Sequence, residues 1–184
     1  MTGRPTRAMQ AANLVVFQLA WFAAVLGAAH GFPLLGTACV VAAIGWHIGV
    51  SARPAAEAKL VGLACLIGFA FESFAAMRGV VSYPSGQPDP RLAPYWMVAL
   101  WGLLAIALNV TMRWLRPRLW LAALLGAVVG PASFISGVQL GGARFVDAPS
   151  ALADLALMWT VALPTLVWLS MRFDGVAVPE AAHA

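Results

Sequence analysis

Charged residues are scarce in this chain of 184 residues: aspartate, glutamate, lysine and arginine make up 10% of it, whereas 62% of the residues are hydrophobic. Soluble domains carry about 25% charged residues. A water-soluble protein of this length could not bury so much apolar side chain, because a small domain leaves a large share of its surface exposed. The shortage of charge therefore excludes an ordinary soluble domain and indicates a protein whose solvent is lipid.

Cysteine is also scarce, and a dense basic tract is lacking. Cys39 and Cys65 lie in apolar runs without C-x-x-C or cysteine–histidine spacing, so we expect no redox role, no metal site and no cofactor. The 11 basic residues are scattered at the ends of apolar runs, which is typical of topology determinants and not of a nucleic-acid surface. No P-loop, dinucleotide-binding, nucleophile-elbow or zincin motif occurs, so the sequence predicts no catalytic residues and leaves enzymatic activity open.

Apolar stretches long enough to cross a bilayer follow one another along the chain. A spanning helix needs about 20 mostly apolar residues. The runs that qualify lie at about 9–29, 32–50, 59–78, 94–115, 118–140 and 150–172. We therefore predict an all-α, polytopic transmembrane bundle of about six helices that forms one domain over residues 1–184. The second run is the weakest, and an alternative is that it forms a re-entrant unit with the first, which would leave four or five spans.

The basic residues predict an orientation for these helices. If the N-terminus is cytoplasmic, one side of the membrane holds Arg4, Arg7, Arg53, Lys59, Arg113, Arg116, Arg118 and Arg172. The other side then holds Arg78, Arg91 and Arg144. Basic residues are enriched on the cytoplasmic side of membrane proteins. We therefore expect both termini in the cytoplasm, which agrees with an even number of crossings.

The longest connection, residues 79–93, is rich in proline and glycine, which block helix formation and favour turns. We expect an external loop here, and it either folds over the mouth of the bundle or serves as a plain tether. Tyr83 and Trp96 lie near predicted helix ends, where aromatic rings prefer the headgroup region. Trp101 and Trp159 lie nearer to mid-span and are expected to pack inside the bundle.

Several polar residues fall inside the apolar runs, where they are costly and tend to face the protein interior. A rise of about 1.5 Å per residue places them in two layers. The outer layer holds Glu72, Ser73, Ser133 and Ser136, the inner layer holds Asn13, His47, Asn109 and Thr111, and Gln18 lies between them. From these layers we take Glu72, Gln18, Asn109, Ser133, His47 and Asn13 as candidates for ligand binding or for a proton site.

Glu72 is the sharpest of these signals, because we find no other carboxylate well inside an apolar run. Burial favours the protonated form of a carboxyl group, so Glu72 could carry a proton, act as a general acid or hold helices together. His47 has neither a histidine four residues further on nor an evident partner. Arg113 shares a helix face with Asn109 and is a candidate for binding a lipid headgroup phosphate, with snorkelling of its side chain to the membrane surface as the alternative.

Small residues recur at spacings of three and four along the fifth run, at Gly126, Gly130, Ser133 and Gly137. Such residues let helices approach closely. Pro131 removes one backbone hydrogen bond and is expected to kink or unwind the helix near mid-span. A broken helix beside polar residues can mark a binding cavity, although packing alone would explain the same pattern.

The polar, aromatic and glycine residues resemble those of a bacterial inner-membrane family, domain of unknown function 2878. The resemblance covers nearly the whole chain. It is carried by Asn13…Phe17-Gln18…Trp21-Phe22, by Pro94…Trp96…Trp101…Leu108-Asn109…Trp114-Leu115 and by Gly126…Gly130…Ser133-Phe134…Gly137. Members of this family often carry a histidine where this chain has Val110, and an aspartate where it has Glu72.

The resemblance implies a small helical protein of the bacterial inner membrane without an established activity. It also implies a link to lipid modification, because members can be encoded near enzymes such as cyclopropane-type fatty-acyl synthases. We therefore expect a protein that binds a lipid or isoprenoid between its helices, with membrane lipids and a lipid-modifying enzyme as partners and no nucleic acid. Two alternatives stay open: a small proton-coupled transporter that uses Glu72, and a structural membrane subunit. The oligomeric state is left open.

Overall fold

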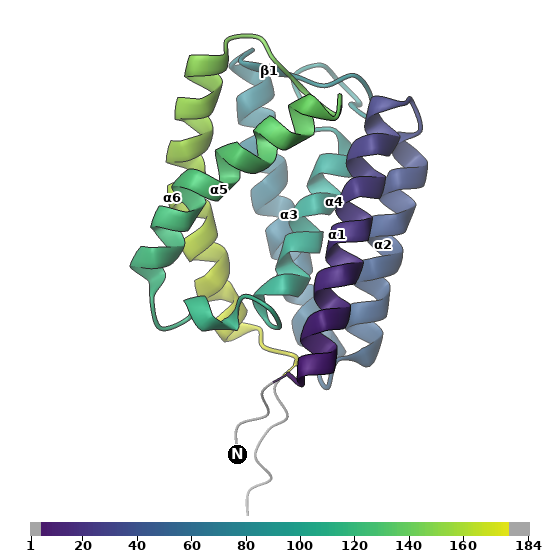
Figure 1. The fold of residues 1–184 in the computed structure, drawn as a ribbon, viewed down its shortest axis with the longest axis vertical. Coiled ribbons are helices and arrows are strands. Elements are labelled where there is room, and N and C mark those ends of the chain that lie inside the picture. The colour runs from purple at the N-terminus through teal and green to yellow at the C-terminus, as the bar shows by residue number, and fades with distance from the viewer. Residues whose placement is uncertain (1–4, 177–184) are drawn as a thin grey trace, which may run out of the picture.

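The computed structural model describes residues 5–176, and in this part of the chain the predicted all-α fold is confirmed (Figure 1). The helices are α1 (Arg7–Ala29), α2 (Pro33–Val50), α3 (Pro54–Met77), α4 (Tyr95–Leu108), α5 (Leu119–Gln139) and α6 (Ala148–Arg172). A short 3-10 helix, η1 (Arg113–Leu115), precedes α5. Two short strands, β1 (Val81–Ser82) and β2 (Arg144–Phe145), pair antiparallel.

Successive helices run in opposite directions, so α1 begins and α6 ends at the same end of the bundle (Figure 1). We call this the terminal end, and we call the opposite end, where β1 lies, the loop end. α1 packs against α2 and α4, α3 packs against α4, and α5 packs mainly against α6. α5 crosses the other helices obliquely, from the terminal end to the loop end.

Five helices in the described chain are long and apolar enough to cross a membrane, namely α1, α2, α3, α5 and α6. The molecule is therefore built as a multi-pass membrane protein. The second apolar run, which was the weakest in the sequence, forms a helix of 18 residues and belongs to this group. α4 has 14 residues, which corresponds to about 21 Å of helix, whereas the hydrocarbon core of a bilayer is about 30 Å thick.

The prediction of one spanning helix over residues 94–115 was therefore wrong at its C-terminal end. α4 stops at Leu108 and is capped by Asn109. The chain then turns, with the backbone N–H of Val110 donating to the carbonyl of Ala107 at 3.1 Å. Hydropathy reports apolar side chains and not backbone conformation, so it could not predict the turn after Leu108. Irregular backbone is tolerated at membrane depth where protein surrounds it, and Leu108, Asn109 and Val110 are all buried.

Glycine residues set the close packing of α5 on α6. A Cβ atom at Gly126 would lie 2.1 Å from the backbone oxygen of Trp159, and one at Gly130 would lie 2.3 Å from the Trp159 ring. Only residues without a side chain fit at such a distance. Of the two expected effects of Pro131, unwinding does not occur, since α5 runs from Leu119 to Gln139 through it, and a kink stays a prediction.

The connection over residues 79–93 folds over the mouth of the bundle and is not a plain tether. β1 pairs with β2 at the loop end, and the Ser85 hydroxyl donates to the carbonyl of Ala28 on α1 at 2.8 Å. The indole N–H of Trp96 donates to the carbonyl of Ser85 at 3.0 Å. Proline and glycine give this segment its turns, while its polar groups bond to the helix ends.

The prediction that Tyr83 and Trp96 anchor the protein in the headgroup region was wrong. Trp96 is 1% exposed and Tyr83 is also buried, because the two rings pack edge to face with centroids 6.0 Å apart. Nearness to a helix end does not distinguish a ring that faces lipid from one that lies beneath a folded loop. Trp101, by contrast, packs inside the bundle as predicted.

Candidate functional site

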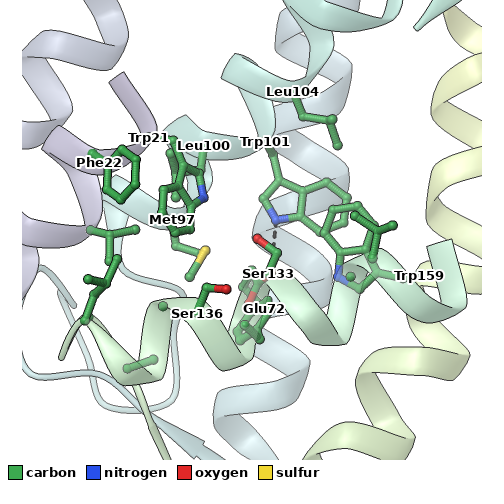
Figure 2. Close-up of a pocket in the computed structure, with 18 of the residues that line it drawn as sticks. Trp21, Phe22, Glu72, Met97, Leu100, Trp101, Leu104, Ser133, Ser136 and Trp159 are labelled. Atoms are coloured by element: carbon green, nitrogen blue, oxygen red, sulfur yellow. Dashed lines mark hydrogen bonds between the residues drawn. The ribbon is translucent and has the colours of Figure 1, made fainter. Parts of the chain in front are cut away.

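A cleft of about 550 Å³ lies between α1, α4 and α5. It reaches Glu72 on α3 and Trp159 on α6. Figure 2 shows side chains from α1, α4 and α5 that surround it, among them Trp21, Leu100 and Ser133. Its volume falls within the range of about 300–1,000 Å³ that is usual for small-molecule sites.

Aromatic rings form one wall of the cleft. Trp101 stacks on Trp159 with ring centroids 4.8 Å apart, and on Phe71 with ring centroids 5.8 Å apart. Helices α3, α4 and α6 each contribute one ring, so the stack ties three helices together. The rest of the lining is mainly apolar.

Glu72 lines the cleft beside Trp101 and is held at both carboxyl oxygens. The indole N–H of Trp101 donates to Oε1 at 3.0 Å, and the hydroxyl of Tyr83 donates to Oε2 at 2.8 Å (Figure 2 shows the first of these bonds). Burial, together with the nearby Glu72 carboxyl group, raises the pKa of Tyr83 well above its usual value. Tyr83 is therefore a hydrogen-bond donor at neutral pH.

Three other polar side chains of the cleft have no hydrogen-bond partner among the described residues. Gln18 on α1 and Ser133 and Gln139 on α5 line the cleft, and none of the three makes a hydrogen bond to another described residue. The Ser136 hydroxyl donates to the carbonyl of Ala132 in its own helix at 3.0 Å. Three side chains that can both donate and accept are thus available to a bound molecule.

The polarity of the cleft changes along its length. Ser133, Ser136 and Gln139 belong to the half of α5 that approaches the loop end (Figure 1). Towards the terminal end the lining consists of apolar residues such as Leu104 and Met112. The cleft is therefore amphipathic: its hydrogen-bonding groups on α5 lie towards the loop end, among apolar residues such as Trp96 and Met97, whereas the part towards the terminal end is apolar.

The remaining candidates lie in a second group of polar residues near the terminal end. We call this group the terminal cluster, and it consists of Asn13, His47, Glu57, Asn109, Thr111, Arg113, Arg116 and Asp174. His47 Nε2 lies 2.9 Å from Glu57 Oε2. The side-chain amide of Asn109 and the backbone N–H of Gly175 each donate to Glu57 Oε1 at 2.6 Å. The Asn13 amide donates to the Ile106 carbonyl at 3.1 Å. These bonds join α1, α2, α3, α4 and the segment after α6.

The segment after α6 is held by arginine residues of the terminal cluster. The Asp174 carboxylate pairs with Arg113 and with Arg116, each at 2.8 Å. Arg116 also donates to the Asn109 side-chain oxygen at 2.6 Å. Arg113, a candidate for a lipid phosphate, thus has its charge paired with a carboxylate of the chain itself.

The structure therefore divides the predicted candidates between two places. Glu72, Gln18 and Ser133 line the cleft, whereas Asn13, His47 and Asn109 belong to the terminal cluster. Thr111 joins the terminal cluster through the Asn13 side chain at 3.4 Å, and Ser73 accepts a bond from the backbone of Ala93 at 3.0 Å.

Glu57 is a buried carboxylate that was not predicted from the sequence. The third apolar run was placed at 59–78, which left Glu57 outside the membrane, whereas α3 begins at Pro54. The signal was present, because proline favours the first turn of a helix and acidic residues favour the same turn. Asp174 was missed because it follows the last apolar run. Among residues 5–176 no group of three or more histidine, cysteine or acidic side chains could hold a metal ion.

The fold and the cleft define a class of protein: a multi-pass helical membrane protein with an amphipathic cleft between its helices. The family described as protein of unknown function (DUF2878) matches residues 10–165. The chain belongs to this family, and the resemblance seen in its sequence is thereby confirmed. No curated protein and no solved structure matches the chain.

Proposed function

We propose that this protein binds a single-chain lipid or isoprenoid in the cleft between α1, α4 and α5. The observation that carries the proposal is the composition of the cleft, in which a largely apolar lining surrounds three polar side chains that have no partner in the described chain. Unpartnered polar groups are costly in an apolar environment. A ligand with a hydrocarbon chain and a small polar end would satisfy both parts of the lining.

Access from the surrounding lipid supports this proposal. Ser133 and Gln18 are exposed although they line the cleft, and so are Phe22 and Val129 at its rim. α1 packs mainly on α2 and α4, while α5 packs mainly on α6. The cleft therefore opens sideways between α1 and α5, two helices that can each cross the membrane. A lipid could enter from the bilayer without passing through water.

Photo-crosslinking tests the proposal directly. Purified protein in lipid nanodiscs would be exposed to a long-chain lipid probe that carries a diazirine on its hydrocarbon chain. We expect labelling of peptides from α1, α4 and α5 that line the cleft, and competition by unlabelled lipid. Labelling spread evenly over the outer faces of the helices would contradict the proposal.

A matched pair of variants on α5 controls for non-specific labelling. Ser133→Trp places a large ring in the cleft, whereas Val128→Trp places the same ring on a face of α5 that is exposed and does not line the cleft. Ser133→Trp should reduce labelling strongly, and Val128→Trp should leave it unchanged. Equal labelling of both variants would show that the probe does not occupy the cleft.

The proposed location is the bacterial inner membrane, with the terminal end facing the cytoplasm. Arg7, Arg53, Lys59, Arg113, Arg116, Arg118 and Arg172 belong to segments at the terminal end, and Arg78, Arg91 and Arg144 to segments at the loop end. Arg4 lies outside the described residues. This imbalance favours a cytoplasmic terminal end. An impermeant thiol reagent applied to intact cells should label Asp89→Cys, which lies in the loop after α3, and should leave Ala52→Cys unlabelled.

We further propose that the bound lipid is delivered to, or received from, an enzyme that modifies membrane lipids. This part of the proposal rests on the family resemblance, while the cleft supports only the binding step. The lipid composition of a deletion strain tests it. A change in modified acyl or isoprenoid species is expected, and an unchanged lipid profile under several growth stresses would contradict it.

A further inference from the structure

We infer that the cleft selects a lipid whose polar end is an uncharged hydroxyl group, and that this end points towards the loop end of the bundle. The inference rests on the proposed function and deepens it, because it names the headgroup chemistry and the orientation of the ligand. It excludes phosphorylated lipids and lipids with a quaternary ammonium group as preferred ligands.

The charges around the cleft argue against an anionic headgroup. Of the described residues that line it, Glu72 is the one ionisable side chain with a charge to offer, and no lysine, arginine or histidine is among them. A phosphate among these lining residues would find no cation among them to pair with, which is unfavourable in an apolar environment. The exposed Arg144 follows the lining residue Ala143 at the loop end but is not itself part of the lining. Arg113 follows the lining residue Met112 in the chain, but its guanidinium group pairs with Asp174 at 2.8 Å.

The position of Glu72 argues against a cationic headgroup as well. Its side chain is 1% exposed, and both carboxyl oxygens accept hydrogen bonds, from Trp101 and from Tyr83. An ammonium group would have to compete with these two hydrogen bonds for the carboxyl oxygens. Glu72 therefore contributes to the polarity of the wall without presenting a free anionic surface.

A hydroxyl group matches what the cleft does present. Gln18, Ser133 and Gln139 each offer a donor and an acceptor, carry no charge and have no partner in the described chain. A hydroxyl group also donates and accepts, so it can bond to any of the three. A headgroup that only accepts hydrogen bonds, such as a simple ester, would leave the amide oxygen of Gln18 without a donor.

The orientation follows from the direction of α5. Its lining residues change from Gly126 and Val129 to Ser133 and Gln139 on the way to the loop end. The hydrocarbon chain would then lie along the apolar part of the cleft, towards Leu104. A lipid in this position has its polar end beside Ser133, in the half of α5 that approaches the loop end.

Three photoreactive probes with the same hydrocarbon chain test the inference. They end in a hydroxyl group, a phosphate monoester or a trimethylammonium group, and each is offered to the protein in nanodiscs at the same mole fraction. We expect the hydroxyl probe to label the cleft about tenfold or more above either charged probe, since each 1.4 kcal/mol of preference corresponds to a factor of ten. Equal labelling, or stronger labelling by a charged probe, would overturn the inference and leave the proposed lipid binding in place.

Failure of the proposed function gives a different result, because none of the three probes would then label the cleft. That outcome would overturn the function and the inference together. Moving the diazirine tests the orientation: a group near the hydroxyl should label residues 133–139, and a group at the far end of the chain should label residues 104–112. The reverse pattern would overturn the orientation.

Variants of the unpartnered polar residues sharpen the test. Ser133→Ala and Gln18→Leu remove hydrogen-bonding groups while keeping the cleft open, so each should reduce the preference for the hydroxyl probe by several-fold. Thr165→Val is the control, because Thr165 is half-buried on α6, bonds to the carbonyl of Val161 in its own helix and lies outside the cleft. A preference that survives both Ser133→Ala and Gln18→Leu would contradict the assignment of these groups.

Discussion

The hydroxyl group of Tyr83 donates a hydrogen bond of 2.8 Å to Oε2 of Glu72, and this bond joins the loop after α3 to a carboxyl group inside the bundle. Tyr83 also packs edge to face on Trp96, with ring centroids 6.0 Å apart. The loop and the wall of the cleft are therefore parts of one packed unit. A change in the loop should alter the stability of the wall.

Replacing Tyr83 by phenylalanine tests this connection. The variant leaves one oxygen of a buried carboxyl group without its donor, and we expect a loss of about 1 kcal/mol of unfolding free energy. Tyr95→Phe is the matched control, because Tyr95 is 37% exposed and its hydroxyl makes no hydrogen bond to a described residue. Thermal unfolding in a mild detergent measures both variants. Equal stability of the two would contradict the structural role of the Tyr83 bond.

Glu72→Gln separates lipid binding from proton-coupled transport. Glutamine keeps the shape of the side chain and can still accept from Trp101, but it cannot carry a proton. If the protein binds a lipid as proposed, cleft labelling should stay within about twofold of the wild type, since the exchange alters neither the volume nor the unpartnered polar groups. A transporter with Glu72 as its proton site would lose pH-dependent flux in proteoliposomes. Loss of such flux would favour transport over the proposed function.

Glu57 should be important for stability and unimportant for the cleft. It contacts His47 at 2.9 Å and accepts bonds from Asn109 and the Gly175 backbone, so Glu57→Ala leaves several buried polar groups unpaired. Removing one partner of such a buried network costs about 3–5 kcal/mol. Lys59→Ala, two residues further along α3 and exposed, should change stability by less than about 0.5 kcal/mol.

The experiment on Glu57 includes a second measurement. At a temperature where the Glu57→Ala variant remains folded, it should bind the photoreactive lipid as the wild type does, because the terminal cluster shares no side chain with the cleft. Selective loss of lipid labelling in a folded variant would show that the two regions act together. That result would contradict their separation.

Gly126 tests the packing of α5 on α6. A methyl group there would lie 2.1 Å from the backbone oxygen of Trp159, so Gly126→Ala must push the helices apart, at a cost of about 1–3 kcal/mol. Gly137→Ala is the matched control on the same helix, because nothing lies within 4 Å of the added methyl group. It should be neutral or gain up to about 1 kcal/mol. Similar losses for both variants in thermal unfolding would contradict the packing.

Hydropathy was sufficient to predict where the helices lie, because an apolar run of about 20 residues has few other stable states. Hydropathy was least accurate at the end of α4, where the side chains remain apolar although the backbone leaves the helical conformation. The run that contains α4 stays apolar beyond Leu108, yet the chain turns at Asn109, whose side chain bonds to Glu57. The tertiary partner that stabilises this turn comes from 52 residues away, and nothing local reveals it.

The candidate residues were identified by depth, but depth alone could not show which of them share a site. Glu72 and Ser133 line one cleft because α5 crosses the bundle obliquely, a feature that no helical period encodes. His47 had no evident partner because Glu57 was placed outside the membrane. Recognising Pro54 as the first residue of a helix would have brought Glu57 to the same depth as His47.

A structure determined in lipid nanodiscs would show whether the cleft holds a lipid. We expect elongated density in the cleft, with one end within hydrogen-bonding distance of Ser133 or Gln18 and the rest along α4 towards Leu104. Side chains of α1 and α5 in direct contact across a closed cleft, with the polar groups bonded to one another, would contradict this expectation.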